Sequence, residues 1–424
     1  MEIKEMVNEL LNEKYYKINH TSGLTIYVFP KENYSTTYAV FGTKYGSIDT
    51  VFRKPGEEKY TEVPEGIAHF LEHKLFESEE LDAFERFAKT GASANAYTSF
   101  DKTCYLFSCS GNFKENLDIL LDFVRHPYFT QKTVEKEQGI IGQEIRMYRD
   151  VPDWRVLFNL LCAMYKNHPV RIDIAGTEDS IAEISADLLY KCYEDFYNLG
   201  NMALAVAGNV SVEEVIDSAD KLLTTDESFE IDRKFIEEEK EVVTDYVEEK
   251  LSVACPIFSL GFKETWSTPE RTLKEELLGN IILEAIAGNT SDLYKDLIEK
   301  ELINPTFSTE YFTGYGYSAM IFSGESKDPK KTSEIIKEKV KEIKEAGISE
   351  EDFERARKKL YGREIMSYND VDELANNLIA ADFMNEGLFD EFETLKILTC
   401  GEANEFLSKI LEEKYSALSV ILPA

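Results

Sequence analysis

The stretch PEGIAHFLEHKLF, residues 64–76, contains two of the five histidines of this 424-residue chain. Its first two residues, proline and glutamate, suit the first turn of a helix and the positive end of the helix dipole. Residues three and four apart lie on one face of a helix, so His69 and His73 would lie side by side with Glu72 next to them. The other sides of the helix carry residues that can be buried: Ile67, Phe70, Leu71 and Leu75.

Two neutral imidazoles suit zinc, and a catalytic zinc site usually has three protein ligands and one water. We therefore expect a third ligand, a carboxylate on a separate helix. The predicted helix at residues 131–149 offers Glu135, Glu137 and Glu144. Glu137 and Glu144 are two turns apart and share a face, so one could bind the metal and the other could support a ligand from behind.

The spacing H-x-x-E-H is the inverted form of the H-E-x-x-H motif of zinc proteases. Zinc would lower the pKa of a bound water toward about 7. Glu72, which is not a ligand in this interpretation, would accept the proton of that water and pass it to the leaving amine. The alternative is a helix whose histidines merely pack or lie exposed. The scarcity of histidine and the acidic helix that follows favour the metal site.

The same order of strand, helix, turn and helix occurs twice, at residues 105–111, 112–124 and 131–149 and again at 318–324, 331–345 and 351–366. Three elements in matching order indicate that the two halves of the chain are distant repeats.

Residues 224–250 are acidic and polar and lack a core pattern, so we interpret them as a solvated linker. The expected organisation is an N-terminal metal-carrying catalytic domain at 1–223, this acidic linker, and a homologous non-catalytic domain at 251–424. Strands and helices interleave without a regular βαβ alternation. This favours an α+β fold with two tandem domains, each a mixed or antiparallel sheet with helices packed mainly on one face.

The formal net charge of −33 opposes binding to nucleic acid and to anionic membranes. It can reflect a preference for basic or neutral substrates or solubility alone, and we favour solubility. No apolar run reaches the roughly 18 residues of a transmembrane helix, and the first residues lack a secretory or transit signal. We therefore expect a cytoplasmic protein. The six cysteines form no C-x-x-C pair, which argues against a thiolate zinc site.

Several segments together resemble the family of zinc peptidases that includes pitrilysin, insulin-degrading enzyme and mitochondrial processing peptidase. The resemblance covers nearly the whole chain and depends on GIAHFLEHKLF (66–76), GASANAYTS (91–99), Glu137 to Glu144, and FYNLGNM (196–202). The stretch HPVRIDIAG (168–176) is similar to bacterial members, from Gram-positive organisms, that are often described as associated with modification of elongation factor P.

The resemblance implies that His69, His73 and Glu144 hold one zinc ion and that Glu72 is the general base. Glu137 matches a second glutamate of the family pattern, seven residues before the ligand, and would support the metal site from the second shell. Manganese or cobalt in place of zinc stays open.

The resemblance also implies that Asn95 and Ala96 lie on an edge strand to which the substrate adds as a further strand. This mode selects unfolded peptides, because the peptide backbone supplies the hydrogen bonds. On the residues alone, GASAN would be interpreted as a loop and Asn95 as a turn residue.

One departure concerns the second half. Active single-chain relatives carry an arginine and a tyrosine after a helix like residues 291–302, where they bind substrate and stabilise the oxyanion. Ile298 and Asn304 stand near those positions here, and no histidine follows His168. Either a paralogous subunit supplies the missing pair, or tyrosines at 311–317 substitute. We favour the partner, because the aromatic run is better explained as a strand that packs on a helix.

We therefore expect a zinc peptidase subunit that hydrolyses unfolded peptides, as a homo- or heterodimer with a paralogous subunit and without nucleic acid or membrane partners. The alternatives are a non-catalytic peptide-binding or assembly protein of the same fold, and a zinc hydrolase that acts on small molecules.

Overall fold

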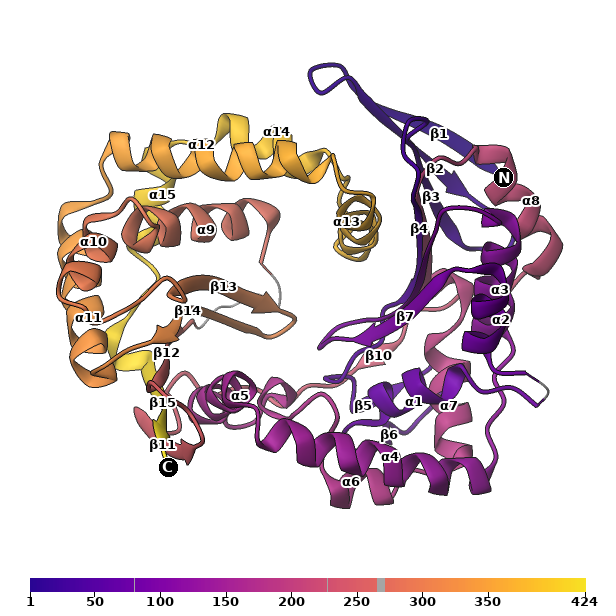
Figure 1. Ribbon diagram of the computed structural model, residues 1–424, viewed down its shortest axis with the longest axis horizontal. Helices are drawn as coiled ribbons and strands as arrows, with labels where there is room; N and C mark the ends of the chain where they lie inside the picture. Colours follow the sequence, from indigo (N-terminus) through magenta and orange to yellow (C-terminus); the bar gives the residue numbers. More distant parts are fainter. Residues whose placement is uncertain (80, 227, 265–270) are drawn as a thin grey trace. The chain divides into compact units, whose positions relative to one another are not determined.

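The computed structural model describes residues 1–79, 81–226, 228–264 and 271–424 (Figure 1). Glu227, which belongs to the predicted acidic linker, lies outside the described residues. The chain forms two compact units. The first unit comprises Met1–Gln143, Asp173–Lys234 and Ile365–Asp390, and the second comprises Glu144–Ile172, Phe235–Glu364 and Glu391–Ala424. Within the described ranges, every helix is too short or too polar to cross a membrane.

The first unit is built on a seven-stranded sheet with the order β1-β2-β3-β9-β4-β8-β7 (Figure 1). All neighbouring strands are antiparallel except β3 and β9, which are parallel. The central strands β4 and β9 are apolar and buried along their whole length, as expected for strands covered on both faces. The strands are β1 (Glu2–Asn8), β2 (Glu13–Asn19), β3 (Thr25–Pro30), β4 (Thr37–Thr43), β7 (Ser93–Thr98), β8 (Thr103–Cys109) and β9 (Met202–Gly208).

Helices cover both faces of this sheet, but unequally. A single helix from the C-terminal half, α13 (Val371–Phe383), packs on one face against β9, β4 and β3 (Figure 1). The other helices of the unit are α1 (Ile67–Leu75), α2 (Ala83–Thr90), α3 (Phe113–Arg125), α6 (Glu178–Ala182), α7 (Ala186–Phe196), α8 (Val212–Leu222) and most of α4 (Gln131–Arg149). A small sheet joins β5 (Val51–Arg53), β6 (Thr61–Glu62) and β10 (Asp232–Arg233).

The second unit contains a five-stranded sheet with the order β11-β15-β12-β14-β13. Its strands are β11 (Tyr246–Leu251), β12 (Ile257–Lys263), β13 (Ser308–Gly314), β14 (Tyr317–Glu325) and β15 (Ser416–Pro423). Here α5 (Pro152–Met164), from the N-terminal half, packs against β15, β12 and β11. The remaining helices are α9 (Leu273–Ala287), α10 (Asp292–Glu299), α11 (Pro329–Ala346), α12 (Glu350–Ser367), α14 (Asp390–Ile397) and α15 (Cys400–Leu407).

The two sheets repeat one topology. The five strands β3-β9-β4-β8-β7 match β11-β15-β12-β14-β13, because in each set the first pair is parallel and every other pair is antiparallel. In each repeat a strand (β8 or β14) leads into three helices, of which the third crosses to the sheet of the other unit. The predicted α+β class and the predicted repeat are therefore confirmed.

The compact units follow a different division from the predicted boundaries at 223 and 251. The chain enters the second unit inside α4 and returns to the first unit at Asp173. It enters the second unit again at Phe235 and returns to the first near the end of α12. The segments 144–172 and 365–390 therefore belong to the unit built mainly from the other half. The boundaries 1–223, 224–250 and 251–424 stay a prediction of how the two repeats divide along the chain.

The sequence predicted that the acidic segment 224–250 is solvated, but part of this segment is buried. The side chain of Glu238 is only 12% exposed, and its carboxylate accepts hydrogen bonds from the backbone N–H groups of residues 166–168. The same carboxylate pairs with the ammonium of Lys263 at 2.9 Å. Lys263 is 2% exposed, and a buried ammonium requires a counter-charge, which explains why an acidic segment packs here.

This ion pair predicts a stability effect. Glu238→Gln leaves the buried Lys263 ammonium without its carboxylate, so we expect a loss of about 3 kcal/mol in the free energy of unfolding. The neighbouring variant Glu239→Gln is the matched control, because it breaks only the exposed pair with Lys166, which is worth less than about 1 kcal/mol. Thermal unfolding monitored by circular dichroism measures both. Equal melting temperatures for the two variants would contradict the assigned role of Glu238.

Candidate functional site

Two glycines fix the start of α1, the helix that carries the histidines. Gly66 precedes α1 with φ +86°, and a Cβ at this position would lie 2.3 Å from the carbonyl oxygen of Ala175. Gly176 has φ +75°, and a Cβ there would lie 2.5 Å from the carbonyl oxygen of Glu65. Only glycine accommodates both the positive φ and this close approach. The loop before α6 therefore packs directly against the first turn of α1.

One side of α1 is anchored in the core of the first unit. Phe70 and Leu71 are fully buried, and Lys74 is also fully buried and paired with Glu77. Residues at this helical spacing leave His69, Glu72 and His73 together on another face. The anchoring restricts rotation of the helix and so sets the direction of the three polar side chains.

The structure brings His69 and His73 of α1 together with Glu144 of α4. One ligand atom from each residue lies within 4.8 Å of the other two, and no other such trio of His, Cys, Asp or Glu occurs among the described residues. The two imidazole rings have centroids 4.5 Å apart. Burial lowers the pKa of His69 to about 3, so its imidazole is neutral at pH 7, the form that binds a metal. Two imidazoles and one carboxylate form a donor set of catalytic zinc sites, so these residues fit zinc.

Glu137 of α4 contacts His73. Its Oε1 lies 3.1 Å from Nδ1 of His73. Because a carboxylate only accepts, Nδ1 carries the proton in this hydrogen bond, and Nε2 of His73 keeps its lone pair for a metal. Glu137 and Glu144 are seven residues apart on α4, so one helix face supplies both the hydrogen bond to His73 and the third candidate ligand. Glu137 thus lies where it can orient the His73 ring, and its role in supporting a metal site stays a prediction.

Glu72 is held by the strand next to the site. Glu72 is 9% exposed, and its Oε2 accepts a hydrogen bond of 2.8 Å from the hydroxyl of Thr98, the last residue of β7. Glu72 does not belong to the trio that could hold a metal. Thr98 was not among the site residues expected from the sequence. Its signal was the position in the segment GASANAYTS, which we had connected with substrate and not with the orientation of the base.

Asn95 and Ala96 lie on β7, the last strand of the first unit's sheet. They pair with Leu106 and Tyr105 of β8, and β8 is the one strand with which β7 pairs in the described part of the chain. The segment is thus an edge strand, where the residues alone would have suggested a loop. The binding of substrate by Asn95 and Ala96 stays a prediction.

The second unit contains a partial counterpart of this arrangement. Thr313 of β13 pairs with Ser318 as Thr98 pairs with Thr103, and the Thr313 hydroxyl donates to Glu276 of α9 at 3.0 Å. Glu276 therefore corresponds to Glu72. The residues three before and one after it are Leu273 and Leu277, where α1 has histidines.

The residues at the aligned arginine and tyrosine positions have other contacts. Ile298 packs against the apolar core of the second unit, and the Asn304 side chain donates to Glu325 at 2.5 Å. In the aromatic run, the Tyr311 ring fills the space beside Gly279 of α9. This contact agrees with our preferred interpretation of the run as a strand that packs on a helix.

Known proteins resemble both the sequence and the fold. Residues 56–178 match the family described as Insulinase (Peptidase family M16), and residues 183–360 match Peptidase M16 inactive domain. The chain is 43% identical to an uncharacterized zinc protease, YmfH, of Bacillus subtilis, over 98% of this chain and 97% of that protein. It is 31% identical to the mitochondrial-processing peptidase subunit beta of Caenorhabditis elegans over 40% of this chain and 38% of that one.

The fold is also similar to a crystal structure described as an M16-like peptidase from Alicyclobacillus acidocaldarius. That match has a TM-score of 0.93 and 35% identity, and it covers 100% of this chain and 99% of the other. Because both family segments occur in order and near-full-length relatives share more than a third of the residues, the chain belongs to the M16 family of peptidases, the family of insulinase and pitrilysin.

Proposed function

We propose that this chain is the metal-carrying subunit of a zinc peptidase that hydrolyses peptide bonds in unfolded peptides. The observation that carries the proposal is the convergence of ligand atoms from His69, His73 and Glu144 within 4.8 Å, with Glu72 on the same face of α1. The relatives named zinc proteases support the same activity. The other two histidines of this unit, His20 and His126, have partners elsewhere, since His20 contacts Ser22 and Asp220 and His126 contacts Asp122.

In the proposed mechanism His69, His73 and Glu144 hold the zinc. When bound, zinc would act as a Lewis acid that makes water more acidic and polarises the scissile carbonyl. Glu72 would accept the proton that the attacking water loses and donate it to the leaving amine nitrogen. The Thr98 hydroxyl donates a hydrogen bond to Oε2 of Glu72 and so orients the carboxylate for this transfer. Glu137 keeps the His73 ring in one orientation through the bond to Nδ1.

We propose that the substrate backbone pairs with the free edge of β7 along Asn95 and Ala96. An edge strand offers unpaired N–H and C=O groups, and an extended peptide can satisfy them by adding one strand. Thr98 belongs to the same strand and contacts Glu72, so a peptide on this edge would lie next to the general base. Folded proteins would be excluded, since their backbone groups are already paired.

We further propose that the working enzyme is a dimer, either of two copies or with a paralogous subunit, in the cytoplasm. Leu273 and Leu277 remove the second possible metal site, and Ile298 and Asn304 stand where an oxyanion-stabilising pair was expected. In a heterodimer the paralogous chain would supply that pair, which a second copy of this chain lacks as well. A similar mitochondrial relative is itself named as a subunit.

Glu72→Gln tests the general base. The amide keeps the shape and the hydrogen bond to Thr98 but cannot take a proton at neutral pH, so kcat for an unstructured peptide should fall by about 10²–10⁴-fold. Zinc content, measured by atomic emission on the same sample, should be unchanged. Glu65→Gln, one residue before Gly66, is the control with equal charge change. Undiminished cleavage by the Glu72 variant would overturn the mechanism, and a zinc-free wild type that cannot be reconstituted would favour the non-catalytic alternative.

Substitutions on α4 test the ligand set without an activity assay. Glu144→Gln should abolish stoichiometric zinc binding, whereas Glu137→Gln should weaken it by about 10–100-fold, because it removes only the acceptor of the His73 N–H. Competition with a chromophoric chelator measures both affinities. Glu135→Gln, on an exposed face of the same helix, should bind zinc like the wild type. Full zinc affinity in the Glu144 variant would refute the assignment.

The dimer proposal predicts that the purified monomer cleaves peptides slowly and that a paralogous chain restores the rate. Light scattering gives the mass of the species present, and cleavage of one fluorogenic peptide is followed for each chain alone and for the mixture. A verified monomer with the full rate of the mixture would contradict the need for a partner.

A further inference from the structure

One backbone donor on the free edge of β7 is already occupied by a side chain of the same strand. The N–H of Ala96 donates a hydrogen bond of 2.9 Å to the amide oxygen Oδ1 of Asn95. Asparagine is depleted in strands, because its side chain competes with the hydrogen bonds between strands. An asparagine in the middle of β7 that makes this contact therefore needs an explanation.

The pairing of β7 with β8 indicates that this N–H points away from β8. The N–H of Ser99 donates to the carbonyl of Lys102 at 2.8 Å, so these two residues form a hydrogen-bonded pair. Hydrogen-bonded pairs alternate along an antiparallel ladder, which makes Tyr97 and Asn95 members of such pairs with β8. Ala96 lies between them, so its N–H and C=O face the free edge of the sheet.

Stability alone does not require this hydrogen bond. Asn95 is exposed, and an N–H group at an exposed edge can donate to water with little loss. The side chain instead changes the availability of the donor. While Oδ1 of Asn95 accepts from Ala96, the carbonyl of an added strand cannot accept from it, so the amide oxygen occupies the place that a peptide carbonyl would take.

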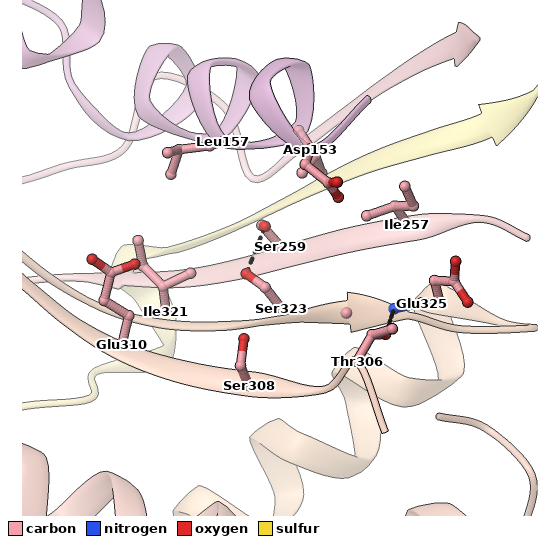
Figure 2. A pocket seen from close by; sticks show the side chains of 12 residues that line it. Asp153, Leu157, Ile257, Ser259, Thr306, Ser308, Glu310, Ile321, Ser323 and Glu325 are labelled. Carbon is pink, nitrogen blue, oxygen red and sulfur yellow. Dashed lines mark hydrogen bonds between the residues drawn. The ribbon is translucent and has the colours of Figure 1, made fainter. Parts of the chain in front are cut away.

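The second repeat uses the same position differently. Thr313 of β13 is the counterpart of Thr98. Glu310 and Asn95 each lie three residues before these threonines and therefore correspond. The Glu310 side chain lines a cavity of about 370 Å³ between β13 and α5, with Asp153 on the helix side (Figure 2). Asn95 instead turns its amide back onto its own strand, so the contact comes from the sequence of β7 and not from the shared topology.

The occupied donor lies close to the proposed general base. Ala96 and Thr98 are two residues apart on β7, so their side chains point to the same face of the strand. The Thr98 hydroxyl contacts Glu72 on that face. A peptide residue that pairs with Ala96 would therefore lie next to the groups that the proposed mechanism uses.

We propose that Asn95 is a specificity-determining residue that acts as a displaceable cap on the substrate edge, an inference that rests on the proposed binding of peptides along β7. A peptide carbonyl must displace Oδ1 before it accepts from Ala96, so at this position one hydrogen bond replaces another. A net gain comes from the other positions that face the edge, Ala94 and Thr98. The site therefore favours extended segments that span the strand over short peptides that reach Ala96 alone.

The first measurement tests the cap without any peptide. The full chain is prepared with isotope-labelled alanine, and NMR follows the exchange of the Ala96 amide proton with water. Asn95→Ala should speed this exchange by about 2–10-fold, after correction for the intrinsic rates of the two sequences, because one hydrogen bond is lost. Asn95→Asp retains an acceptor oxygen and should keep the slow exchange. Ser93→Ala is the matched control, since it removes another exposed side chain from the same face of β7 and leaves the cap in place.

The second measurement tests displacement, with the full chain carrying Glu72→Gln so that the peptide stays intact. The probe is a fluorescent peptide that is longer than β7, blocked at both ends and free of charged side chains. Anisotropy should show that the added Asn95→Ala change tightens binding by about 2–10-fold, whereas Ser93→Ala leaves it unchanged. An end-blocked tripeptide should compete with the probe better in the Asn95 variant than in the parent.

Weaker or unchanged binding by the Asn95→Ala variant would overturn the proposal, since the side chain would then hold the peptide or fail to compete with it. An unchanged exchange rate of the Ala96 amide in that variant would overturn it as well. Absence of peptide binding in every variant would refute both the substrate edge and the cap. A wild-type chain that binds the peptide without cleaving it would refute the peptidase function and leave the cap standing, so the two failures can be told apart.

Discussion

The hydrogen bond between Nδ1 of His73 and Glu137 joins the helix with the two histidines to the helix with Glu144. The candidate ligands come from segments about seventy residues apart in the sequence, so their convergence depends on how α1 and α4 pack. The bond fixes both the ring orientation and the register between the helices. The close contact at Gly66 and the buried side of α1 fix the position and the rotation of α1 itself.

The second unit shows the same framework with different chemistry. The contact between Thr313 and Glu276 repeats the one between Thr98 and Glu72, so the strand–helix geometry persists without a metal motif. Leucines at 273 and 277 turn that helix face into ordinary core.

The sequence predicted what depends on local spacing. The i, i+3, i+4 pattern of His69, Glu72 and His73 and the seven-residue spacing of Glu137 and Glu144 indicated the helices and the shared faces, and α4 has the predicted bounds. The predicted strand 318–324 and helices 331–345 and 351–366 lie within one or two residues of β14, α11 and α12. Choosing Glu144 over Glu137 as the ligand depended on the family resemblance.

What the sequence missed depends on contacts between distant segments. Thr98 can be recognised as the partner of Glu72 only once β7 is placed beside α1. The acidic segment around Glu238 looked solvated because nothing local reveals the buried Lys263 that it neutralises.

Helix α5, from the N-terminal half, packs on the second unit's sheet, and α13, from the C-terminal half, packs on the first unit's sheet. This limits how the chain can be divided. Each half of the sequence contributes the helix that covers the sheet built by the other half. A cut in the acidic segment would therefore produce two fragments, each with one apolar sheet face uncovered and one apolar helix without a sheet. We expect that neither fragment folds by itself, because each lacks the helix that covers its sheet. We therefore expect the two halves to fold together and not as two modules that can be separated or shuffled.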